Sequence, residues 1–250
     1  MPPVRTGPGS LLWPGLCALG ALAILLGLGT WQLQRHAWKN ALIATVEARI
    51  ARPAEPAPAQ ARWPDVRYDT DEYRRVFVTG RFRHDLETAV YALRDSAPGA
   101  PGGPGFVVLT PLETDDGAFV LVNRGFVPND RRRAETRPEG QAAGTVTVTG
   151  LLRLPEQAGL FQPGNDPVRE GWYVRDPAEI AAARHLAPVA PFIVDADAKL
   201  NPGGLPQGGL TRIDFPNRHL EYAFTWFGLA GTLVGVFAVF AFGRLRRREV

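Results

Sequence analysis

Apolar residues are concentrated in two long segments, one near each end of the chain. The first runs from Leu11 to Leu33, where Thr30 and Gln32 are the strongly polar side chains. The second runs from Tyr222 to Phe242 and contains no charged residue. As a helix, each segment is long enough to cross a hydrocarbon core of about 30 Å. Neither segment has the polar face of a surface helix, so we expect two transmembrane helices.

The first segment has one alternative interpretation, a cleaved secretory signal with Arg5 as its basic region. Such a signal usually has an apolar stretch of about 7 to 15 residues, and this one is longer. A convincing small-residue cleavage site is also lacking after it. These features favour a membrane helix that stays in the protein.

A helical pattern continues beyond the first apolar segment. Trp38, Leu42, Val46 and Ile50 recur at intervals of four, which predicts that the helix extends out of the bilayer. The stretch 51–64 contains closely spaced prolines, which remove hydrogen-bond donors and favour extended conformations. We therefore expect a stiff linker there, without regular secondary structure.

The middle of the chain shows short strand patterns separated by Gly, Pro, Asp and Asn. Five strands are predicted, at Arg74–Phe82, Thr88–Leu93, Gly105–Leu112, Ala118–Asn123 and Thr145–Leu152. Valine and threonine alternate from 145 to 149, as expected for a half-buried antiparallel strand. Short gaps favour hairpins, and Gly117 is placed to take a positive φ in the loop 113–117.

One helix is predicted after these strands. Asp176 has the position of an N-cap, Pro177 stands at the first helical position, and Glu179 follows three residues after the cap. A further strand is predicted at Pro191–Asp195, and Ala97–Pro104 has the composition of a loop or flap. Together the elements predict a membrane protein of the α+β class. A two-helix transmembrane hairpin would carry one inserted, mostly antiparallel, β-rich extracytoplasmic domain.

The patterns divide the chain into a short cytoplasmic N-terminus (1–10), transmembrane helix 1 (11–33), a helix extension with its Pro-rich linker (34–64), the β-rich domain (65–221), transmembrane helix 2 (222–242) and a basic cytoplasmic tail (243–250). Four arginines follow the second helix, at Arg244, Arg246, Arg247 and Arg248. The positive-inside rule places such a cluster in the cytoplasm, so both termini are expected there. Basic residues also follow the first helix, but a long domain translocates largely regardless of its charge.

Composition suggests a compartment and argues against one class of partner. The net charge is only +3 and part of the basic charge is the terminal cluster, so nucleic acid binding has little support. Lys39 and Lys199 are the only lysines in a chain rich in Arg, Ala, Gly and Pro, which hints at a GC-rich bacterial genome. We therefore expect the bacterial inner membrane, with the main domain in the periplasm. Cys17 is the only cysteine, so no internal disulfide forms.

Polar and aromatic residues gather at the predicted outer end of the first membrane helix. Trp31, Arg35 and Trp38 lie at i, i+4 and i+7, so one face carries two indoles around a guanidinium. An aromatic belt with a snorkelling cation explains the same pattern. Gln32 is harder to explain in this way, because an amide at the edge of the bilayer needs a polar partner.

His219, Tyr222 and Trp226 share a face at the start of the second membrane helix. A neutral imidazole at a helix end is a suitable axial ligand for haem iron, and the adjacent rings could pack on a porphyrin. The alternative is a helix-entry histidine that hydrogen bonds to a lipid headgroup or a neighbouring loop. Spacing alone favours this alternative.

The segment 120–128 is a third candidate. Gly125 can take a positive φ in a turn after the strand, and Arg124 could point to an acidic partner or a haem propionate. A plain turn explains the same residues. The four histidines lack the clustered spacing of a metal site, and no nucleophile elbow, P-loop or dinucleotide motif is present. These absences argue against a membrane-anchored hydrolase.

Four motifs occur in order along the chain: Leu-Gly-x-Trp-Gln-x-x-Arg at 28–35, Leu-Val-Asn-Arg-Gly-Phe-Val-Pro at 121–128, Gly-Trp-x-x-x-Asp at 171–176 and Asn-x-His-x-x-Tyr-Ala-x-x-Trp at 217–226. Together with the two-helix layout, they resemble the surfeit locus protein one family over nearly the whole chain. Phe126 is a departure, because the family more often has Trp after the Asn-Arg-Gly. The change is a conservative aromatic one.

The resemblance implies an assembly factor for cytochrome c oxidase that assists the insertion of haem a into the catalytic subunit, and not an enzyme. It implies transient haem a binding at the outer membrane face, with His219 as the axial iron ligand. Five further residues would pack on the ring or pair with its propionates: Tyr222, Trp226, Trp31, Arg35 and Arg124. The expected partners are oxidase subunit I, haem a synthase and the lipid bilayer. The alternative is a haem-free, membrane-anchored binding module that stabilises a nascent oxidase subunit.

Overall fold

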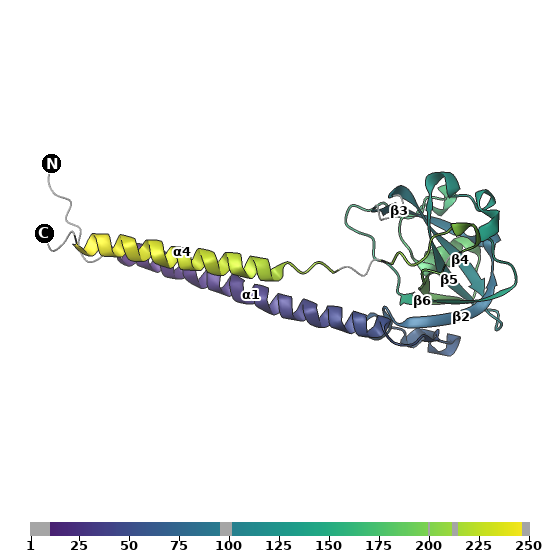
Figure 1. The fold of residues 1–250 in the computed structure, drawn as a ribbon, viewed down its shortest axis with the longest axis horizontal. Helices are drawn as coiled ribbons and strands as arrows, with labels where there is room; N and C mark the ends of the chain where they lie inside the picture. The colour runs from purple at the N-terminus through teal and green to yellow at the C-terminus, as the bar shows by residue number, and fades with distance from the viewer. Residues whose placement is uncertain (1–10, 96–101, 200, 212–214, 247–250) are drawn as a thin grey trace. The chain divides into compact units, whose positions relative to one another are not determined.

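The computed structural model describes residues 11–95, 102–199, 201–211 and 215–246 (Figure 1). The chain divides into a helical unit, residues 1–45 and 214–250, and a β-rich unit, residues 46–213. Two long helices, α1 (Leu12–Ile50) and α4 (His219–Arg246), come before and after the strands in the sequence. The predicted order, one apolar helix on each side of a β-rich domain, is confirmed.

In the helical unit, α1 and α4 lie side by side and antiparallel. Gly15 on α1 lies near the ring of Phe237, whereas Gln32, further along α1, hydrogen bonds to His219 at the start of α4. Both helices are long and apolar enough to cross a membrane, and only 6% of the most apolar window of each is buried. Arg244 and Arg246 lie in the last turn of α4, whereas residues 247–250 of the predicted basic tail are outside the described part of the chain.

Close packing of the two helices depends on a small residue in the first motif. Gly29 faces Phe227, and a Cβ at this position would lie 2.7 Å from the aromatic ring. Next to it, the hydroxyl of Thr30 donates to the carbonyl of Leu26 at 2.7 Å, so this polar side chain is satisfied within the helix. The sequence of the first motif therefore suits a helix that packs tightly against a neighbour.

The β-rich unit contains a seven-stranded sheet in the spatial order β1-β2-β6-β7-β5-β4-β3. The strands are β1 (Glu55–Pro56), β2 (Arg75–Phe82), β3 (Thr88–Arg94), β4 (Gly103–Glu113), β5 (Phe119–Pro128), β6 (Thr145–Arg153) and β7 (Val189–Ala196). β2 also pairs with β4, which closes five of the strands into a small barrel. Most pairs between the named strands are antiparallel, and β1–β2 and β5–β7 are parallel. The prediction of a mostly antiparallel sheet is confirmed.

Alternate side chains of the barrel strands fill two separate cores. Val122 and Phe192 belong to the core inside the barrel, with apolar residues of β2, β4 and β6. Leu121 and Ile193, their neighbours in sequence, pack with Ile180 of α3 (Pro177–Arg184) on the other side of the sheet. This two-sided burial follows from the period of two in a strand, and it fixes the register of β5 and β7.

The predicted N-cap of α3 is confirmed, because a side-chain oxygen of Asp176 accepts from the N–H groups of Ala178 and Glu179. The remaining helix is α2 (Tyr68–Asp71). Short 3₁₀ turns complete the described structure: η2 (Gln60–Asp65), η3 (His84–Leu86), η4 (Asn129–Arg131), η5 (Ala134–Thr136), η6 (Pro138–Gly140), η7 (Pro167–Arg169) and η8 (Pro202–Gly204).

Two local predictions are wrong. The chain does not turn at Arg124 and Gly125, because β5 continues through both residues and the register shifts there opposite β4. Arg124 is the extra residue of a β-bulge, while Gly125 has φ +122, so its predicted positive φ is confirmed. The linker 51–64 also contains regular structure, since β1 pairs with β2 and η2 follows it. Of the predicted loop Ala97–Pro104, residues 97–101 lie outside the described part of the chain, whereas Gly103 and Pro104 begin β4.

Candidate functional site

The start of α4 and the adjacent turns of α1 form a polar site next to the apolar segments of the two helices. Nδ1 of His219 lies 2.7 Å from Oε1 of Gln32. An amide oxygen only accepts, so Nδ1 carries the proton and donates it. In the neutral tautomer with this proton, Nε2 is unprotonated, and it makes no hydrogen bond to the described residues. Gln32 therefore has the polar partner that its position required.

A cavity of about 250 Å³ opens beside this hydrogen bond. Its lining consists of Gln32, Pro216, Arg218, His219 and Tyr222. Pockets that enclose a drug-sized ligand measure about 300 to 1,000 Å³, so this one is too small to enclose a macrocycle. Tyr222 is 54% exposed and adds an accessible aromatic surface beside the cavity. A large planar ligand held here would remain mostly outside the protein.

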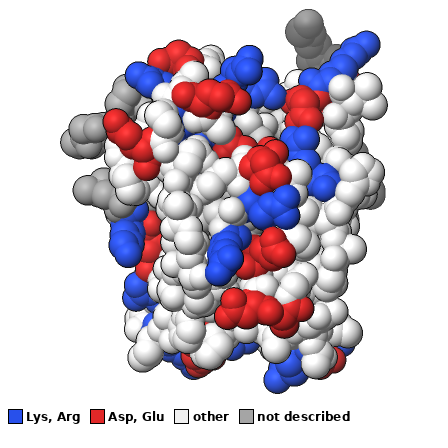
Figure 2. Space-filling view, turned by 90° about the vertical axis from the view of Figure 1, so that its right-hand side faces the viewer, with Lys and Arg blue, Asp and Glu red and all other residues white. Residues whose placement is uncertain are grey.

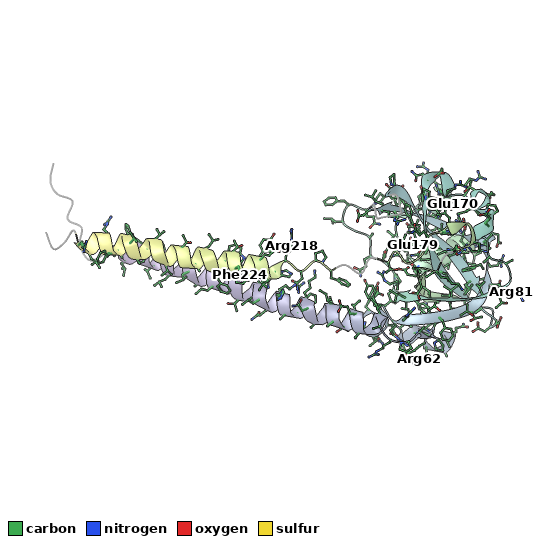
Figure 3. The ribbon with its side chains drawn as sticks, in the orientation of Figure 1. Arg62, Arg81, Glu170, Glu179, Arg218 and Phe224 are labelled. Atoms are coloured by element: carbon green, nitrogen blue, oxygen red, sulfur yellow. The ribbon has the colours of Figure 1, made fainter. Side chains whose placement is uncertain are left out.

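A second set of hydrogen bonds ties the segment before α4 to α1. Nδ2 of Asn217 donates to Oδ1 of Asn40 at 2.8 Å, and Nδ2 of Asn40 lies 3.0 Å from Nε2 of His36. The amide nitrogen donates, so Nε2 of His36 is already occupied as an acceptor. Asn217 opens the last motif, and its amide thus helps to hold the two helices together. Figure 3 labels Arg218, which directly precedes α4, and Phe224, which lies in its second turn.

The other predicted residues of the helical unit lie outside the cavity. Trp31 and Trp38 are 53% and 51% exposed, and the guanidinium of Arg35 lies 4.0 Å from the centre of the Trp38 ring. This arrangement is also that of an aromatic belt with a cation. Trp226 is half-buried, and its indole N–H is buried without a hydrogen-bond partner in the described structure. Of the predicted haem-site residues, His219 and Tyr222 line one cavity.

Arg124 lies inside the β-rich unit and is 2% exposed. Its guanidinium donates to the carbonyl of Gly140 and to Oδ1 of Asn201, and it lies 4.8 Å from the centre of the Phe82 ring. Burial, together with the nearby charge of Arg137, lowers the pKa of Arg124 to about 10. The expectation that Arg124 faces an acidic partner or a propionate does not fit this position, because the side chain is committed to internal contacts.

Asp195 was not singled out by the sequence, yet segments from two motifs meet at its carboxylate. It accepts from Nδ2 of Asn123 at 2.7 Å and from Nη1 of Arg175 at 3.0 Å. Arg153 and the hydroxyl of Thr211 complete the set, at 3.3 and 2.9 Å. Asp195 is 2% exposed, so the two guanidinium groups replace the water that a surface carboxylate would contact. The side chain connects β5, β6 and β7 with the segments that precede α3 and α4.

Acidic and basic side chains are interspersed on the face of the molecule shown in Figure 2. This face therefore lacks the broad basic surface that a nucleic-acid backbone requires. Within the described residues, no group of three His, Cys, Asp or Glu side chains is placed to hold a metal ion.

Comparisons with known proteins cover most of the chain. The model of the SURF1 family matches residues 19–231. Surfeit locus protein 1 of Mus musculus is 39% identical over 217 residues, which are 83% of this chain and 69% of the mouse protein. The protein of the same name from Homo sapiens is 40% identical over 215 residues, 82% of this chain and 69% of its own length. The SURF1-like protein of Monosiga brevicollis is 38% identical over 229 residues, with 89% and 84% covered.

The family match includes Gln32 and the Asn217–Trp226 motif, and the similarity to the animal proteins extends over more than four fifths of the chain. The resemblance seen in the four motifs is therefore confirmed. The chain belongs to the SURF1 family.

Proposed function

We propose that this protein is a membrane-anchored assembly factor for cytochrome c oxidase that assists the insertion of haem a into the catalytic subunit. In this role it holds haem a transiently through His219 and acts as a chaperone, without a catalytic step of its own. Family membership supports the part in oxidase assembly. The observation that carries the haem proposal is the hydrogen bond between Gln32 and His219.

A metal-binding histidine usually donates its second ring N–H to an oxygen, which fixes the tautomer and the orientation of the ring. Gln32 accepts this hydrogen bond from His219 and leaves Nε2 available. Imidazole nitrogen is a common axial ligand of haem iron. Tyr222 offers an aromatic surface beside the imidazole, and the exposed Arg35 is the remaining candidate for a propionate. The residues present therefore fit a haem that His219 would hold through Nε2 of its imidazole.

The same proposal places α1 and α4 across a membrane. Their apolar surfaces are exposed over most of their length. Exposure of this surface costs free energy in water but not in lipid. The arginines at the end of α4 favour a cytoplasmic location for that end, and the antiparallel packing puts the start of α1 on the same side. The proposed compartment is the bacterial inner membrane with the β-rich unit in the periplasm, and its bacterial origin rests on composition.

The haem proposal is tested by the haem content of protein purified from cells that make haem a. We expect His219→Ala to lose most of the bound haem and its absorption spectrum. His36→Ala is the matched control, because this second imidazole of the helical unit already has its Nε2 occupied by Asn40. Equal haem content in wild-type protein and His219→Ala would refute the proposed ligand.

Gln32 should act as a positioning residue for His219. We expect Gln32→Leu to weaken haem binding by about 10- to 100-fold, which is the usual effect of removing an outer hydrogen bond from a metal-binding histidine. Gln32→Glu keeps an oxygen acceptor at the same distance and should restore much of the affinity. Haem titration followed by absorbance measures both effects. Identical affinities of the Leu and Glu variants would show that the hydrogen bond does not orient the ligand.

The second candidate function is a haem-free, membrane-anchored module that stabilises a nascent oxidase subunit. A cavity along an open strand edge of the β-rich unit favours it. This function predicts copurification with the subunit and an isolated protein without haem. A deletion strain tests both candidates together, because normal haem a content and normal oxidase turnover in it would contradict each of them.

A further inference from the structure

β3 is the last strand of the sheet, and one of its edges is only partly covered. It pairs with β4 on one side. On the other side, Trp172 lies opposite Val90 in a parallel bridge, and the N–H of Tyr91 donates to the carbonyl of Trp172 at 2.8 Å. The chain then leaves the edge, because the N–H of Val174, the next residue that could pair with β3, donates to Oδ1 of Asn165 instead. A segment of this chain thus occupies one position of the edge and stops.

The next position along β3 has main-chain groups available. Backbone groups of alternate residues in an edge strand point outward. Since the N–H of Tyr91 points to Trp172, the N–H of Leu93 points the same way, and no described residue outside the sheet ladder accepts from it. Leu93 is also 73% exposed and Tyr91 45% exposed. Exposed apolar side chains beside free backbone groups are the features that promote strand addition.

A cavity of about 530 Å³ runs along this part of the strand. All residues from Val90 to Asp95 line it, together with Phe126, Tyr173 and Leu210. Its volume lies within the range of about 300 to 1,000 Å³ that is typical of ligand pockets. The edge and the cavity therefore form one continuous surface, with room for a side chain next to the free backbone groups.

The arginines of the cavity already have polar partners. Arg153 and Arg175 both bind the buried carboxylate of Asp195. Arg94 donates to Oε1 of Gln207 at 2.8 Å, and its guanidinium lies 5.5 Å from the centre of the Phe126 ring. A charged ligand group would have to displace these contacts, whereas an apolar group would contact the aromatic and aliphatic part of the wall. The lining therefore favours an uncharged side chain.

We infer that β3 binds an extended segment of a partner polypeptide, which adds to the sheet next to Trp172 and inserts an uncharged aliphatic or aromatic side chain into the cavity. The peptide runs parallel to β3, as Trp172 does. Its residue opposite Ala92 accepts from the N–H of Leu93 and donates to the carbonyl of Tyr91, which repeats the pattern begun at Val90. This binding does not require haem and remains if the role of His219 is refuted.

The test uses the full-length protein in detergent and a fluorescent, end-blocked peptide, Thr-Val-Thr-Phe-Thr-Val-Thr, in a polarisation assay. We expect saturable binding. Two control peptides should bind about tenfold more weakly or worse, one with alternate amides N-methylated and one with Glu in place of Phe. The first lacks the main-chain donors, and the second carries a charge into the cavity. Equal binding of all three peptides, or no binding, would overturn the inference.

Leu93→Pro and Leu93→Thr separate the edge from its side chain. Proline removes the outward N–H of residue 93 and leaves the ladder bonds to β4 intact. Proline is tolerated in an edge strand where the N–H faces away from the sheet. We expect Leu93→Pro to lose about tenfold or more in affinity, and Leu93→Thr, which keeps the N–H, to lose clearly less. His219→Ala should bind the peptide like wild-type protein. If Leu93→Pro fails to fold, the N-methylated peptide still decides the question on the wild-type chain.

A second copy of this chain is the competing occupant of the edge. It would give a dimer in sedimentation experiments without peptide, and Leu93→Pro would dissociate that dimer. This result would overturn the assignment to a partner polypeptide. Protection of the amide of Leu93 from hydrogen exchange on peptide addition, in a monomeric protein, would support it.

Discussion

Among single residues, His84 shows how burial in the β-rich unit controls ionisation. Its Nε2 lies 2.9 Å from the carbonyl of Ala142, and its Nδ1 lies 3.5 Å from Nη1 of Arg124. Burial lowers the pKa of His84, and the charges of Arg124 and Arg137 lower it further. The Asp85 carboxylate and the Ala142 hydrogen bond act in the opposite direction. The folded protein therefore holds a neutral imidazole among buried cations.

This arrangement predicts a loss of stability in mild acid. A histidine whose pKa is lower in the folded than in the unfolded chain binds its proton more readily on unfolding. Its stabilising contribution is present above the unfolded pKa of about 6.5 and is lost as the pH falls toward the folded value. We expect a lower urea midpoint of the β-rich unit at pH 5.5 than at pH 7.5, measured on the detergent-solubilised chain.

His84→Gln should reduce that pH dependence, because glutamine does not titrate. Burial raises the pKa of Glu87. This shift changes stability with pH in the opposite direction to that of His84, because it favours the folded state at low pH. The comparison of wild type with His84→Gln cancels this second contribution. An unchanged difference between the two pH values in the variant would show that His84 is not its source.

The residues of the candidate site were predictable to different degrees. A polar amide near the end of an apolar helix predicts a polar partner, and His219 is that partner of Gln32. The internal position of Arg124 was not predictable, since an arginine after a strand usually reaches solvent. Only the bulge in β5 turns its side chain toward Gly140 and Asn201.

At the scale of secondary-structure elements, the bulge in β5 shows where local pattern reading fails. Gly125 was expected to lie in a turn after the strand, because glycine with a positive φ is typical of turns. The same conformation also occurs in bulges, and here the pairing with β4 resumes on both sides of Arg124. The strands with clear alternation, such as β6, were predicted within a residue, because their pattern depends only on the period of two.

Gly125→Ala should severely destabilise the β-rich unit. Gly125 has φ +122, and a Cβ there would overlap the backbone of Gln207 and Gly208. We expect a loss of about 3 kcal/mol or more in the free energy of unfolding. Gly117→Ala is the control, because Gly117 has φ +77 but open space around it, and it should cost only about 1 kcal/mol. Similar losses in both variants, measured by chemical denaturation, would mean that the clash is relieved.

The α1–α4 pair offers an equally direct test of packing. A side chain at Gly29 would meet the ring of Phe227, whereas Gly27 has nothing within 4 Å of the same position. We expect Gly29→Val to weaken the helix pair by about 1 to 3 kcal/mol, and Gly27→Val to have little effect. Unfolding of the purified protein in increasing SDS, followed by circular dichroism, measures the difference. Loss of the Gln32–His219 contact should also reduce haem retention in Gly29→Val alone.

At the scale of the molecule, Asp195 links distant parts of the β-rich unit. It lies on β7, yet it binds side chains from β5 and β6 and from the segments around Arg175 and Thr211. Nothing in the local sequence of β7 marks this residue, because its role depends on five segments that meet only after folding. Contacts of this kind cannot be predicted from the local pattern of apolar and polar residues.

Removal of this carboxylate should destabilise the whole β-rich unit. Asp195→Ala leaves Arg153 and Arg175 without their shared buried anion, and we expect a loss of about 3 to 5 kcal/mol. Asp197→Ala is the control, because its ion pair with Arg75 is 33% to 40% exposed and should contribute at most about 1 kcal/mol. Thermal and urea unfolding of both variants distinguish the two cases. A loss below about 1 kcal/mol for Asp195→Ala would show that the arginines find other partners.

The end of α1 belongs to the β-rich unit. Its contacts determine the residue at which a fragment containing only this unit should begin. Val46 is 3% exposed, and Arg49 donates to the carbonyls of Asp69 and Glu72. A fragment that starts after the helix, at residue 51, would discard both anchors and leave these carbonyls without their donors. One that starts at residue 45 or 46 keeps the last helical turn and removes only the preceding part of α1. A fragment of the β-rich unit made for crystallisation or spectroscopy should therefore retain this turn.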